Sequence, residues 1–532
     1  MRLAVTAAND MTTPEIPLMS FGAFSLLPPV LAILLALVTR NVIPALFCGV
    51  WLGATMLAGG NPAAGLYDSF GDFIIPSVGD EWSVTVLIYC GLFGVLIGVL
   101  QRTGGAQAIA RAISARVASR RGAQGATLGL GVLIFFEDYF NALTVGSVMR
   151  PITDRMRVSR EKLAYIVDST SAPMCLLGPV STWVVFVMGL IGTQLATLGL
   201  EGSEYLIYLS SIPLNFYAWL ALGLIVFLVV TQGDYGPMAR AEQRARTTGE
   251  VMAEGANPPS GHEVEEMVSV PEHQSRKRNM LVPIGVLVGM IPPLFLWTGN
   301  FPENDLVTAV GEADGGQSIL IATFVAVAVG LVMGMAQKLF DFREAMEIVV
   351  DGIKSMTLVY IILTLAWSIG SVTTELGTAD YLVTLAEASI APSLVPVLLF
   401  LIGALVAFTT GTSYGTFAIL IPIAMPVAMA MDLPLALAIA AVLSGGIFGD
   451  HCSPISDTTI LSSAGSSCDH IDHVRTQLPY AVTAGLAGIL AFFVAGLTGS
   501  APIGGATGAV AMVATALVLR RCWGLPAERA AA

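Results

Sequence analysis

Long apolar stretches recur along the whole chain, separated by short polar connections. An α-helix needs about 18 to 20 consecutive apolar residues to cross a bilayer, and many of these stretches approach or exceed that length. The pattern predicts eleven crossings. They lie at approximately 20–39, 42–60, 83–101, 161–198, 206–230, 280–298, 317–336, 356–374, 433–468, 476–498 and 502–520. The crossings at 161–198 and 433–468 carry polar runs and prolines, so each is predicted to be a broken helix.

Two further apolar stretches, 124–152 and 393–430, do not fit as full crossings. The first begins and ends beside arginine clusters, and the second begins and ends beside acidic segments. We therefore expect two re-entrant hairpins, which turn at Glu137 to Asn141 and at Thr409 to Tyr414. Irregular backbone at membrane depth is tolerated only where it is buried in protein or lines a water-filled cavity. The two tips are expected to face each other across a site.

The composition supports this interpretation. Of the 532 residues, 55% are hydrophobic and 12% are charged, whereas a soluble domain has about 25% charged residues. We predict an all-α integral membrane protein with no separate soluble domain of any size. The longest polar stretch, 233–278, is predicted to be a poorly ordered cytoplasmic linker. It separates an N-terminal repeat at 1–232 from a C-terminal repeat at 279–500, which is followed by an extra helix and tail at 501–532.

The distribution of charge predicts the topology, because connections rich in Lys and Arg lie in the cytoplasm. The basic clusters contain Arg102, Arg111, Arg116, Arg120 and Arg121, then Arg150, Arg155, Arg157, Arg160 and Lys162, then Arg276, Lys277 and Arg278, and finally Arg520 and Arg521. The acidic connections, expected outside, contain Asp68, Asp72, Asp80, Glu81, Glu201, Glu204, Glu303, Asp305, Glu312 and Asp314. In a cell inner membrane, the N-terminus is then outside and the C-terminus cytoplasmic. The odd number of crossings before the linker makes the two repeats inverted.

The same pattern of breaks occurs in both halves. Residues Phe136 to Trp183 align with Gly411 to Thr458 without a gap, at a constant offset of 275 residues (411 minus 136). The matched identities are Tyr139 with Tyr414, Pro151 with Pro426, Ser169 with Ser444, Pro179 with Pro454 and Ser181 with Ser456. Paired interruptions in the two halves of a membrane chain indicate the binding site of a secondary transporter.

The acids are not duplicated in this alignment. Their aligned positions are Leu443 for Asp168, Cys175 for Asp450 and Thr182 for Asp457. The repeat is therefore expected to supply the frame for alternating access, while an asymmetric set of carboxylates supplies the ion chemistry.

Polar side chains gather at the two hairpin tips and the two breaks. A charged side chain at the bilayer centre costs about 2.5–3.5 kcal/mol, so an acid kept there needs a partner or a function. Hard cations such as sodium prefer carboxylate, hydroxyl and carbonyl oxygens, and desolvation lets a carboxylate exchange a proton near neutral pH. The predicted cation and proton site contains Glu137, Asp138, Asp168, Thr170, Ser171, Thr412, Ser413, Asp450, Ser453, Ser456 and Asp457. Asp457 is the strongest candidate, because a capping role would explain one acid in its break but not Asp450 as well.

Several of these groups also have a structural explanation. Glu137 and Asp138 can form a solvated turn at a hairpin end, and Asp168 can cap the helix that follows it. His451 is interpreted as a hydrogen-bonding neighbour, because no second histidine lies at ligand spacing inside the membrane. The segment Asp469 to Arg475 is interpreted as a solvated cytoplasmic turn.

Three motifs carry a resemblance to a known family. GGIFGDHCSPISDTTILSS at Gly445 to Ser463 is long and specific, whereas DSTSAP at Asp168 to Pro173 and GTSYGTF at Gly411 to Phe417 are shorter. With these motifs the chain resembles the NhaC-type sodium/proton antiporters, a branch of the ion transporter superfamily, over essentially its whole length apart from the linker and termini. The resemblance implies inverted repeats, opposed re-entrant hairpins and secondary transport coupled to sodium or protons.

The preferred hypothesis is therefore a sodium/proton antiporter that exports sodium as protons enter, with no cofactor besides the transported ions. The alternative is a sodium- or proton-coupled carrier of an amino acid or small organic acid, including malate/lactate exchange, with Arg150 as a candidate partner for a carboxylate. Enzymes and primary pumps lack support, because the sequence has no P-loop, metal constellation or nucleophile and base pair. A channel would not need paired breaks.

The sequence says less about other partners. Nucleic-acid binding has no support, because no basic stripe exists beyond the clusters that flank the membrane. The six cysteines show no CxxC spacing and are interpreted as packing residues. The basic stretch Gln107 to Arg121 and its counterpart Asp380 to Ser389 are predicted to lie on the two surfaces of the lipid bilayer. Segments 20–60 and 280–336 carry few charges, which suits a scaffold or a homodimer contact.

Overall fold

The protein is built from helices. A computed structural model describes residues 21–39, 41–114, 117–200, 202–258, 275–311, 313–378, 381 and 391–524. Within these ranges the regular structure is entirely helical. Eleven helices are long and apolar enough to cross a membrane, or up to 13 if each of two bent pairs is counted as one span. The predicted all-α membrane architecture is confirmed.

The predicted crossings coincide with helices in both halves. The elements of the first half are η1 (Gly22–Leu26), α1 (Leu27–Thr39), α2 (Val42–Leu57), α3 (Pro62–Asp68), the π-helical η2 (Ser69–Ile74), α4 (Ile75–Gly79), α5 (Glu81–Thr103), α6 (Gly105–Ser114), α7 (Arg120–Leu133), α8 (Asp138–Arg155), α9 (Arg160–Leu177), α10 (Thr182–Thr197), α11 (Glu204–Ser211), η3 (Ile212–Leu214), α12 (Phe216–Thr231) and α13 (Gly236–Thr247). Those of the second half are α15 (Arg278–Thr298), α16 (Leu306–Gly311), α17 (Gly315–Ala336), α18 (Phe342–Ser355), α19 (Thr357–Glu375), η4 (Pro392–Leu394), α21 (Val395–Thr410), α22 (Ser413–Ala430), α23 (Leu435–Cys452), α24 (Asp457–Ser466), α25 (His470–Thr498) and α26 (Ala501–Trp523).

The connection after α2 differs from the prediction, because it is helical. Its residues form α3, η2 and α4, and this helical run is bent by 115° from α2. The side chain of Asn61 accepts hydrogen bonds from the backbone N–H groups of Ala63 and Ala64, and Pro62 follows at the first helical position. Both features start a helix. The acidic residues assigned to this connection therefore lie on or beside a helix that runs across the end of α2.

Both predicted hairpins are helix pairs joined by short turns, but the prediction that neither stretch fits as full crossings is wrong for the second: its arms, Pro392–Thr410 and Ser413–Ala430, are each long and apolar enough to cross a membrane. The first turn ends earlier than predicted, because Glu137 caps α8 by accepting a hydrogen bond from the Phe140 N–H. The second turn depends on Gly411, whose φ is +69° and where a Cβ atom would lie 2.4 Å from the Ile455 carbonyl oxygen. Only glycine fits both conditions without strain. The second tip therefore packs directly on the break of the second broken helix.

Both broken helices are interrupted where the duplicated pattern places them. The first break separates α9 from α10, which are bent by 42°, and the second separates α23 from α24. Each break ends on one of the aligned serines. Ser181 accepts a hydrogen bond from the Val184 N–H, and Ser456 accepts one from the Thr459 N–H. The matched serines are thus the N-caps of the second half-helix in each repeat.

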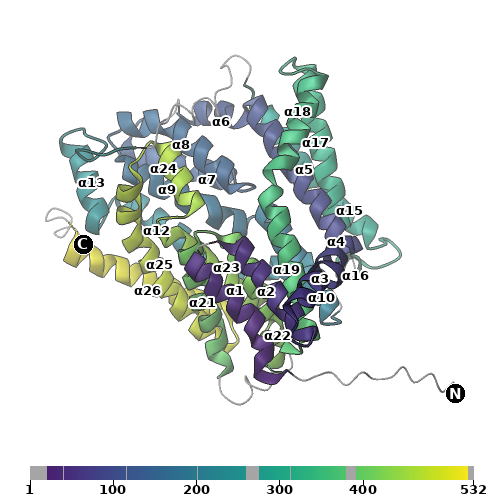
Figure 1. Ribbon diagram of the computed structural model, residues 1–532. Coiled ribbons are helices and arrows are strands. Elements are labelled where there is room, and N and C mark those ends of the chain that lie inside the picture. The colour runs from purple at the N-terminus through teal and green to yellow at the C-terminus, as the bar shows by residue number, and fades with distance from the viewer. Residues whose placement is uncertain are drawn as a thin grey trace, which may run out of the picture.

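The hairpins and the broken helices pack across the two halves. Helix α8 contacts α9 of its own half and α24 of the other, and α22 contacts α23 and α10 in the same way. Outside this crossing, α5 packs with α17 and α18, and α12 packs with α25 and α26. Figure 1 shows these two groups on opposite sides of the molecule. Each hairpin tip is therefore held by both repeats, between two outer groups of long helices.

Part of the predicted linker is packed into the protein. Glu242 on α13 accepts a hydrogen bond from the Ser159 N–H at 2.8 Å and forms an ion pair with Arg120. Asp234, which precedes α13, lies 2.6 Å from the ammonium of Lys162, and both side chains are buried. The prediction of poor order is therefore wrong for residues 233–258.

Some sequence predictions fall outside the described residues. They concern the N-terminus, Arg116, Glu201, Glu312, residues 259–274 of the linker and nearly all of Asp380 to Ser389. Helix α6 covers part of the predicted surface stretch Gln107 to Arg121. The four-part domain division, the orientation of the termini and the homodimer contact stay predictions.

Candidate functional site

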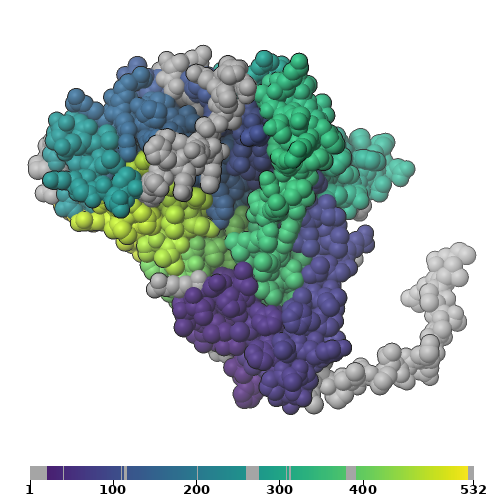
Figure 2. Space-filling view, turned by 45° about the horizontal axis from the view of Figure 1, so that its top comes forward, coloured from purple at the N-terminus to yellow at the C-terminus, as the bar shows by residue number. Residues whose placement is uncertain are grey.

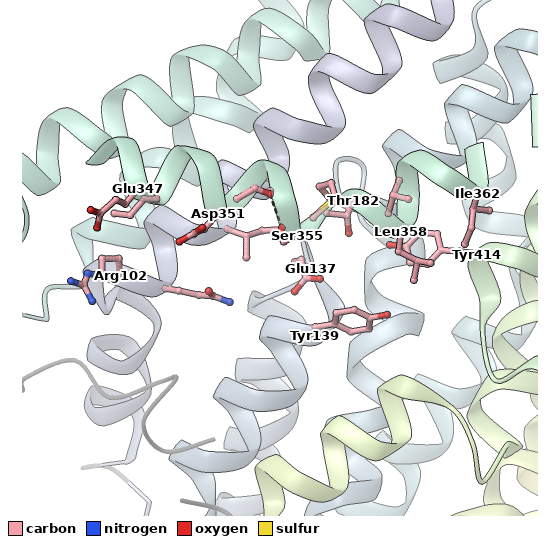
Figure 3. Close-up of a pocket in the computed structure, with 18 of the residues that line it drawn as sticks. Arg102, Glu137, Tyr139, Thr182, Glu347, Asp351, Ser355, Leu358, Ile362 and Tyr414 are labelled. Atoms are coloured by element: carbon pink, nitrogen blue, oxygen red, sulfur yellow. Dashed lines mark hydrogen bonds between the residues drawn. The ribbon is translucent and has the colours of Figure 1, made fainter. Parts of the chain in front are cut away.

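A cavity of about 530 Å³ leads from charged residues on α5 and α18 to the first hairpin tip. Figure 2 shows the surface hollowed beside α18, and Figure 3 shows the residues that line the cavity. Its outer lining includes Arg102, Glu344, Glu347 and Asp351, and its inner lining includes Glu137, Tyr139, Thr182 and Tyr414. Arg102 and Glu344 are 57% and 43% exposed, whereas Glu137 is 6% exposed. The cavity therefore connects the surface with a buried acid.

The first tip is fastened to the first broken helix by polar contacts. The Phe136 carbonyl oxygen accepts a hydrogen bond from the Thr182 N–H at 3.1 Å. The side-chain amide of Asn141 donates to three carbonyl oxygens, those of Gly131 at 2.8 Å, Ile134 at 3.0 Å and Thr170 at 2.8 Å. These contacts satisfy backbone groups that the irregular turn leaves free. The tip and α9 therefore form one unit.

Asp138 is the least satisfied acid at this tip. The residue is 1% exposed, and within the described residues neither carboxylate oxygen accepts a hydrogen bond. The indole N–H of Trp183 and the carboxyl group of Glu137 are its nearest polar neighbours, but neither meets the geometry of a hydrogen bond to it. In the same part of the chain, the side-chain oxygens of Asn141, Thr144 and Thr182 are also buried without a partner. Because buried polar groups nearly always have partners, these oxygens indicate a binding position for a ligand outside the chain.

Asp457, the first residue of α24, lies beside the same tip. The hydroxyl of Tyr139 donates to one of its carboxylate oxygens, and the Thr458 N–H donates to the other at 2.9 Å. Its charge interacts with those of Glu137 and Asp138. The tip of the first hairpin and the break of the second broken helix therefore bring three carboxylates together, and Glu137 and Tyr139 extend this cluster to the cavity.

Asp450 makes the corresponding contact at the second tip. Its Oδ2 accepts a hydrogen bond from the Ser413 hydroxyl at 3.0 Å, while its Oδ1 has no partner within the described chain. At the repeat offset, Ser413 matches Asp138 and Asp450 matches Cys175. The thiol of Cys175 lies within electrostatic range of Asp138.

Within each repeat, the contact between the hairpin tip and its own broken helix therefore includes one of these two carboxylates. The hairpin supplies it in the first half, and the broken helix supplies it in the second. Asp138 and Asp450 thus occupy corresponding contacts although they are not aligned in sequence, and the asymmetric set of carboxylates stays a prediction.

Asp168 lies inside α9, so the capping role considered from the sequence does not apply. Its carboxylate accepts three hydrogen bonds, from Thr459 at 2.9 Å, Ser462 at 3.4 Å and Gln477 at 2.7 Å. The Nε2 atoms of His451 and His473 lie 3.9 and 4.0 Å from Oδ2. Side chains of α24 and α25 therefore satisfy this buried acid.

His451 is confirmed as a hydrogen-bonding neighbour. Its Nε2 lies 2.9 Å from the Ser169 hydroxyl and its Nδ1 lies 2.7 Å from the Tyr217 hydroxyl. The interpretation of Asp469 to Arg475 as a solvated turn is wrong for His473, which is 0% exposed. The physical reason is that α25 already begins at His470, so its first turn carries His473 into the protein.

The other predicted hydroxyl groups mainly hold the backbone. The carbonyl acceptors are Ile166 for Thr170 at 2.8 Å, Val167 for Ser171 at 2.8 Å and Phe408 for Ser453 at 2.7 Å. Ser456 caps α24, and Thr412 occupies the N-cap position of α22. Arg150 contacts Ser467 just beyond the end of α24. The structure does not bring Arg150 to the carboxylates.

A polar stripe on α25 was not predicted. His473, Gln477 and Tyr480 recur at intervals of four and three residues, and all are buried. Gln477 reaches Asp168, and the Tyr480 hydroxyl donates to Asp234 at 2.7 Å. Residues at this spacing share one helix face. The period of polar residues in an otherwise apolar helix is the signal that could have identified them.

Comparison with known proteins places this geometry in a family. The sequence profile described as the Na+/H+ antiporter family matches residues 174–497, a range that contains the second hairpin and the second broken helix. The chain belongs to the Na+/H+ antiporter family. Its members are membrane transporters, so this chain is a multi-span transporter and not an enzyme.

Relatives of this antiporter-family chain differ in what they are named to transport. An uncharacterized protein of Haemophilus influenzae is 34% identical over 94% of this chain and 96% of its own length. A malate-2H(+)/Na(+)-lactate antiporter of Bacillus subtilis is 27% identical over 34% of this chain and 38% of its own length. The arginine/ornithine antiporter ArcD of Halobacterium salinarum is 30% identical over 23% of this chain and 25% of its own length.

Two solved transporters share the fold. Neisseria gonorrhoeae MtrF matches with a TM-score of 0.54 and 15% identity, covering 81% of this chain and 84% of that one. Alcanivorax borkumensis YdaH matches with a TM-score of 0.56 and 16% identity, covering 81% of this chain and 88% of that one. At such low identity the likeness concerns the fold alone.

Proposed function

We propose that this family member is a sodium/proton antiporter that exports sodium in exchange for protons. The observation that carries the proposal is Asp138, a buried carboxylate without a hydrogen-bond partner in the described chain. Its charge interacts with those of Glu137, which lines the cavity, and Asp457. A buried ionised acid is costly unless it is paired. Either a bound sodium ion or a bound proton would neutralise it, and this gives the two ions one site to use in turn.

We take as candidate sodium ligands the buried oxygens of the first hairpin and the first break that have no partner in the described chain. They are the carboxylate oxygens of Asp138, Oδ1 of Asn141 and the hydroxyl oxygens of Thr144 and Thr182. Sodium held by the ionised carboxylate leaves when a proton converts that carboxylate to its neutral form. Because one acid cannot hold both ions at full strength, each proton that binds promotes release of sodium. This competition is the coupling step that an antiporter needs.

A second cavity supports alternating access. It has a volume of about 270 Å³ and is lined by parts of α10 and α22 that lie farther along each helix than Thr182 and Tyr414. Aromatic rings on these two helices lie between the two sets of lining residues. Their centroid distances are 5.1 Å for Trp183 and Tyr414, 5.6 Å for Trp183 and Phe417, and 4.7 Å for Phe186 and Tyr414. We propose that this aromatic cluster closes the path on the outer side while the larger cavity opens to the cytoplasm.

The second candidate is exchange of a small organic acid or amino acid. The size of the larger cavity favours it, because about 530 Å³ exceeds the space that one cation needs. The names of the relatives from Bacillus subtilis and Halobacterium salinarum also favour it. In this alternative, sodium or a proton at Asp138 would drive the organic substrate.

One assay separates the two candidates. Purified protein in liposomes that contain a pH-sensitive dye receives an imposed sodium gradient, with no organic solute present. We expect sodium-dependent proton flux under these conditions. If the dye shows no response, while preloaded malate, lactate, arginine or ornithine exchanges with its labelled form, the sodium/proton proposal is rejected and the second candidate is accepted.

A further inference from the structure

We propose that His470, Ser463 and His473 form a proton relay that leads from the start of α25 to the ring of His473, beside the buried carboxylate of Asp168. The proposal rests on the proposed proton-coupled function and names a route by which protons arrive beside the acids. His470 is partly exposed, whereas Ser463, His473 and Asp168 are each at most 1% exposed. A continuous set of side-chain contacts joins them.

The outer histidine has a fixed tautomer. The Nε2 atom of His470 lies 2.7 Å from the Pro454 carbonyl oxygen. A carbonyl oxygen can only accept, so Nε2 carries a hydrogen. The Nδ1 atom is therefore the position that gains or loses a proton, and it lies 3.1 Å from the Ser463 hydroxyl oxygen.

The tautomer of the inner histidine, His473, is fixed in the same way by its contact with Gln477. The amide nitrogen of Gln477 lies 2.7 Å from the His451 carbonyl oxygen, which sets the orientation of the amide. Its oxygen then faces Nε2 of His473 at 2.9 Å, so this Nε2 also carries a hydrogen. The Nδ1 atom of His473 lies 2.8 Å from the Ser463 hydroxyl oxygen.

The Ser463 hydroxyl therefore faces Nδ1 of both His470 and His473, the nitrogen that gains or loses a proton in each ring. Its own hydrogen has a third acceptor, the Thr459 carbonyl oxygen at 2.7 Å. In the transfer step, Nδ1–H of a protonated His470 gives its proton to the Ser463 oxygen while the Ser463 hydroxyl hydrogen passes to Nδ1 of His473. One N–H bond breaks and one forms, the serine is unchanged, and one positive charge moves inward.

The inner end of the relay is next to the acids. The Nε2 atom of a protonated His473 lies 4.0 Å from Oδ2 of Asp168, which balances the arriving charge. The titratable groups that face His473 are Asp168 from α9, His451 from α23 and His470 from its own helix. Asp168 in turn interacts electrostatically with Asp450 and Asp457. Arrival of a proton at His473 therefore changes the electrostatic potential at the proposed exchange site.

His451 offers no equivalent route. It lies 3.9 Å from the same oxygen of Asp168, but its two ring nitrogens face Ser169 and Tyr217, which are both buried. Neither contact leads to a partly exposed histidine. The difference assigns proton entry to His470 and His473, and a positioning role to His451.

The relay is tested by Ser463→Ala, with Ser463→Thr as the conservative variant that keeps the hydroxyl. Sodium-driven proton flux in liposomes should fall about tenfold or more in Ser463→Ala, while the sodium concentration for half-maximal flux stays unchanged. Ser463→Thr should recover most of the flux. The matched control is Ser466→Ala on the same helix, because the Ser466 hydroxyl has no partner in the described chain. Replacement of the partly exposed His470 by Gln should reproduce the loss without disturbing the core.

A second measurement does not depend on transport. The chain has five histidines, so protein labelled with ¹⁵N only at histidine gives few signals, and His470→Gln and His473→Gln assign the two of interest. In wild type their Nδ1 signals should titrate together, and in Ser463→Ala they should titrate independently. If wild type shows no sodium-driven proton flux, the proposed function fails, and the coupled titration alone decides the relay. Wild-type flux in Ser463→Ala, or independent titration in wild type, overturns the relay.

Discussion

Asp138 and Asp168 are buried to the same extent, yet their surroundings are opposite. Each is 1% exposed. Asp168 accepts hydrogen bonds from three side chains, whereas Asp138 accepts none from the described residues. Burial of a charge is tolerated when it is paired and costly when it is not. The protein therefore supplies hydrogen-bond donors to Asp168. Asp138 has none among the described residues, and we expect a bound sodium ion or proton, exchanged during transport, to neutralise it. Burial alone therefore does not identify a transport site, and the hydrogen-bond donors missing from the described chain are what distinguish Asp138 from Asp168.

The largest effect is expected at Asp457, which joins the two halves through its contact with Tyr139. Asp457→Asn should abolish coupled flux while the protein still inserts, because it removes the negative charge that acts on Asp138 and so changes the affinity of that carboxylate for both sodium and the proton. Proton flux driven by a sodium gradient in liposomes measures this. Tyr139→Phe is the control, because it removes a donor and keeps the acid. A sodium-dependent pH response equal to wild type in Asp457→Asn would contradict the assignment of Asp457 to the ion site.

Asp138→Asn tests whether the carboxylate that has no hydrogen-bond donor in the described chain binds sodium. One ion contact in a partly wet site is worth a few kcal/mol, so sodium affinity should fall about 100-fold. No hydrogen bond within the described chain is lost, so thermal stability without sodium should stay equal or rise. Sodium titration followed by thermal unfolding in detergent measures both quantities. Lower stability without sodium would show that the chain does stabilise this carboxylate.

Asp168→Asn tests the partnered side, and its effect should appear in stability. The new amide oxygen can keep the bonds to Thr459 and Gln477, but the NH2 group then faces the Ser462 hydroxyl, whose hydrogen loses its acceptor. Such a loss typically costs about 1–3 kcal/mol, so the unfolding temperature should fall even without sodium. The comparison is tested most directly by the unfolding temperatures of the two variants without sodium, which should change in opposite directions. Equal changes would show that the protein stabilises both carboxylates in the same way.

The breaks could be predicted because their signals are local. Proline and serine at matched positions interrupt a helix and cap the next one, and Ser181 and Ser456 do so in the structure. The partners of the acids could not be predicted, because they lie far away in sequence. Thr459 is 291 residues from Asp168, and the ion pair of Lys162 with Asp234 joins a supposed basic surface cluster to a supposed linker. The polar composition of these two segments predicted exposure to solvent. In the folded protein, tertiary packing buries Lys162 and Asp234 and gives each a partner of opposite charge.

Glu204 tests whether an unpartnered oxygen is sufficient by itself to mark an ion site. It lies on α11, outside the candidate membrane spans, and its Oε1 is buried without a partner in the described chain. Burial and the nearby charge of Asp314 together raise the pKa of Glu204 to about 7, although backbone N–H groups oppose the shift.

The sign follows from proton uptake. Between the ordinary pKa of a glutamate and about 7, the folded protein holds more protons than the unfolded chain, so stability falls as pH rises through this interval. Glu204→Gln should remove this part of the pH dependence and raise the unfolding temperature above pH 7, with sodium-driven flux unchanged. Unfolding curves at pH 5 to 8 for wild type and variant isolate the difference. Glu204 lines neither the larger nor the second cavity, and we expect it to have no role in transport. Loss of flux in Glu204→Gln would instead show that an ion pathway passes close to α11.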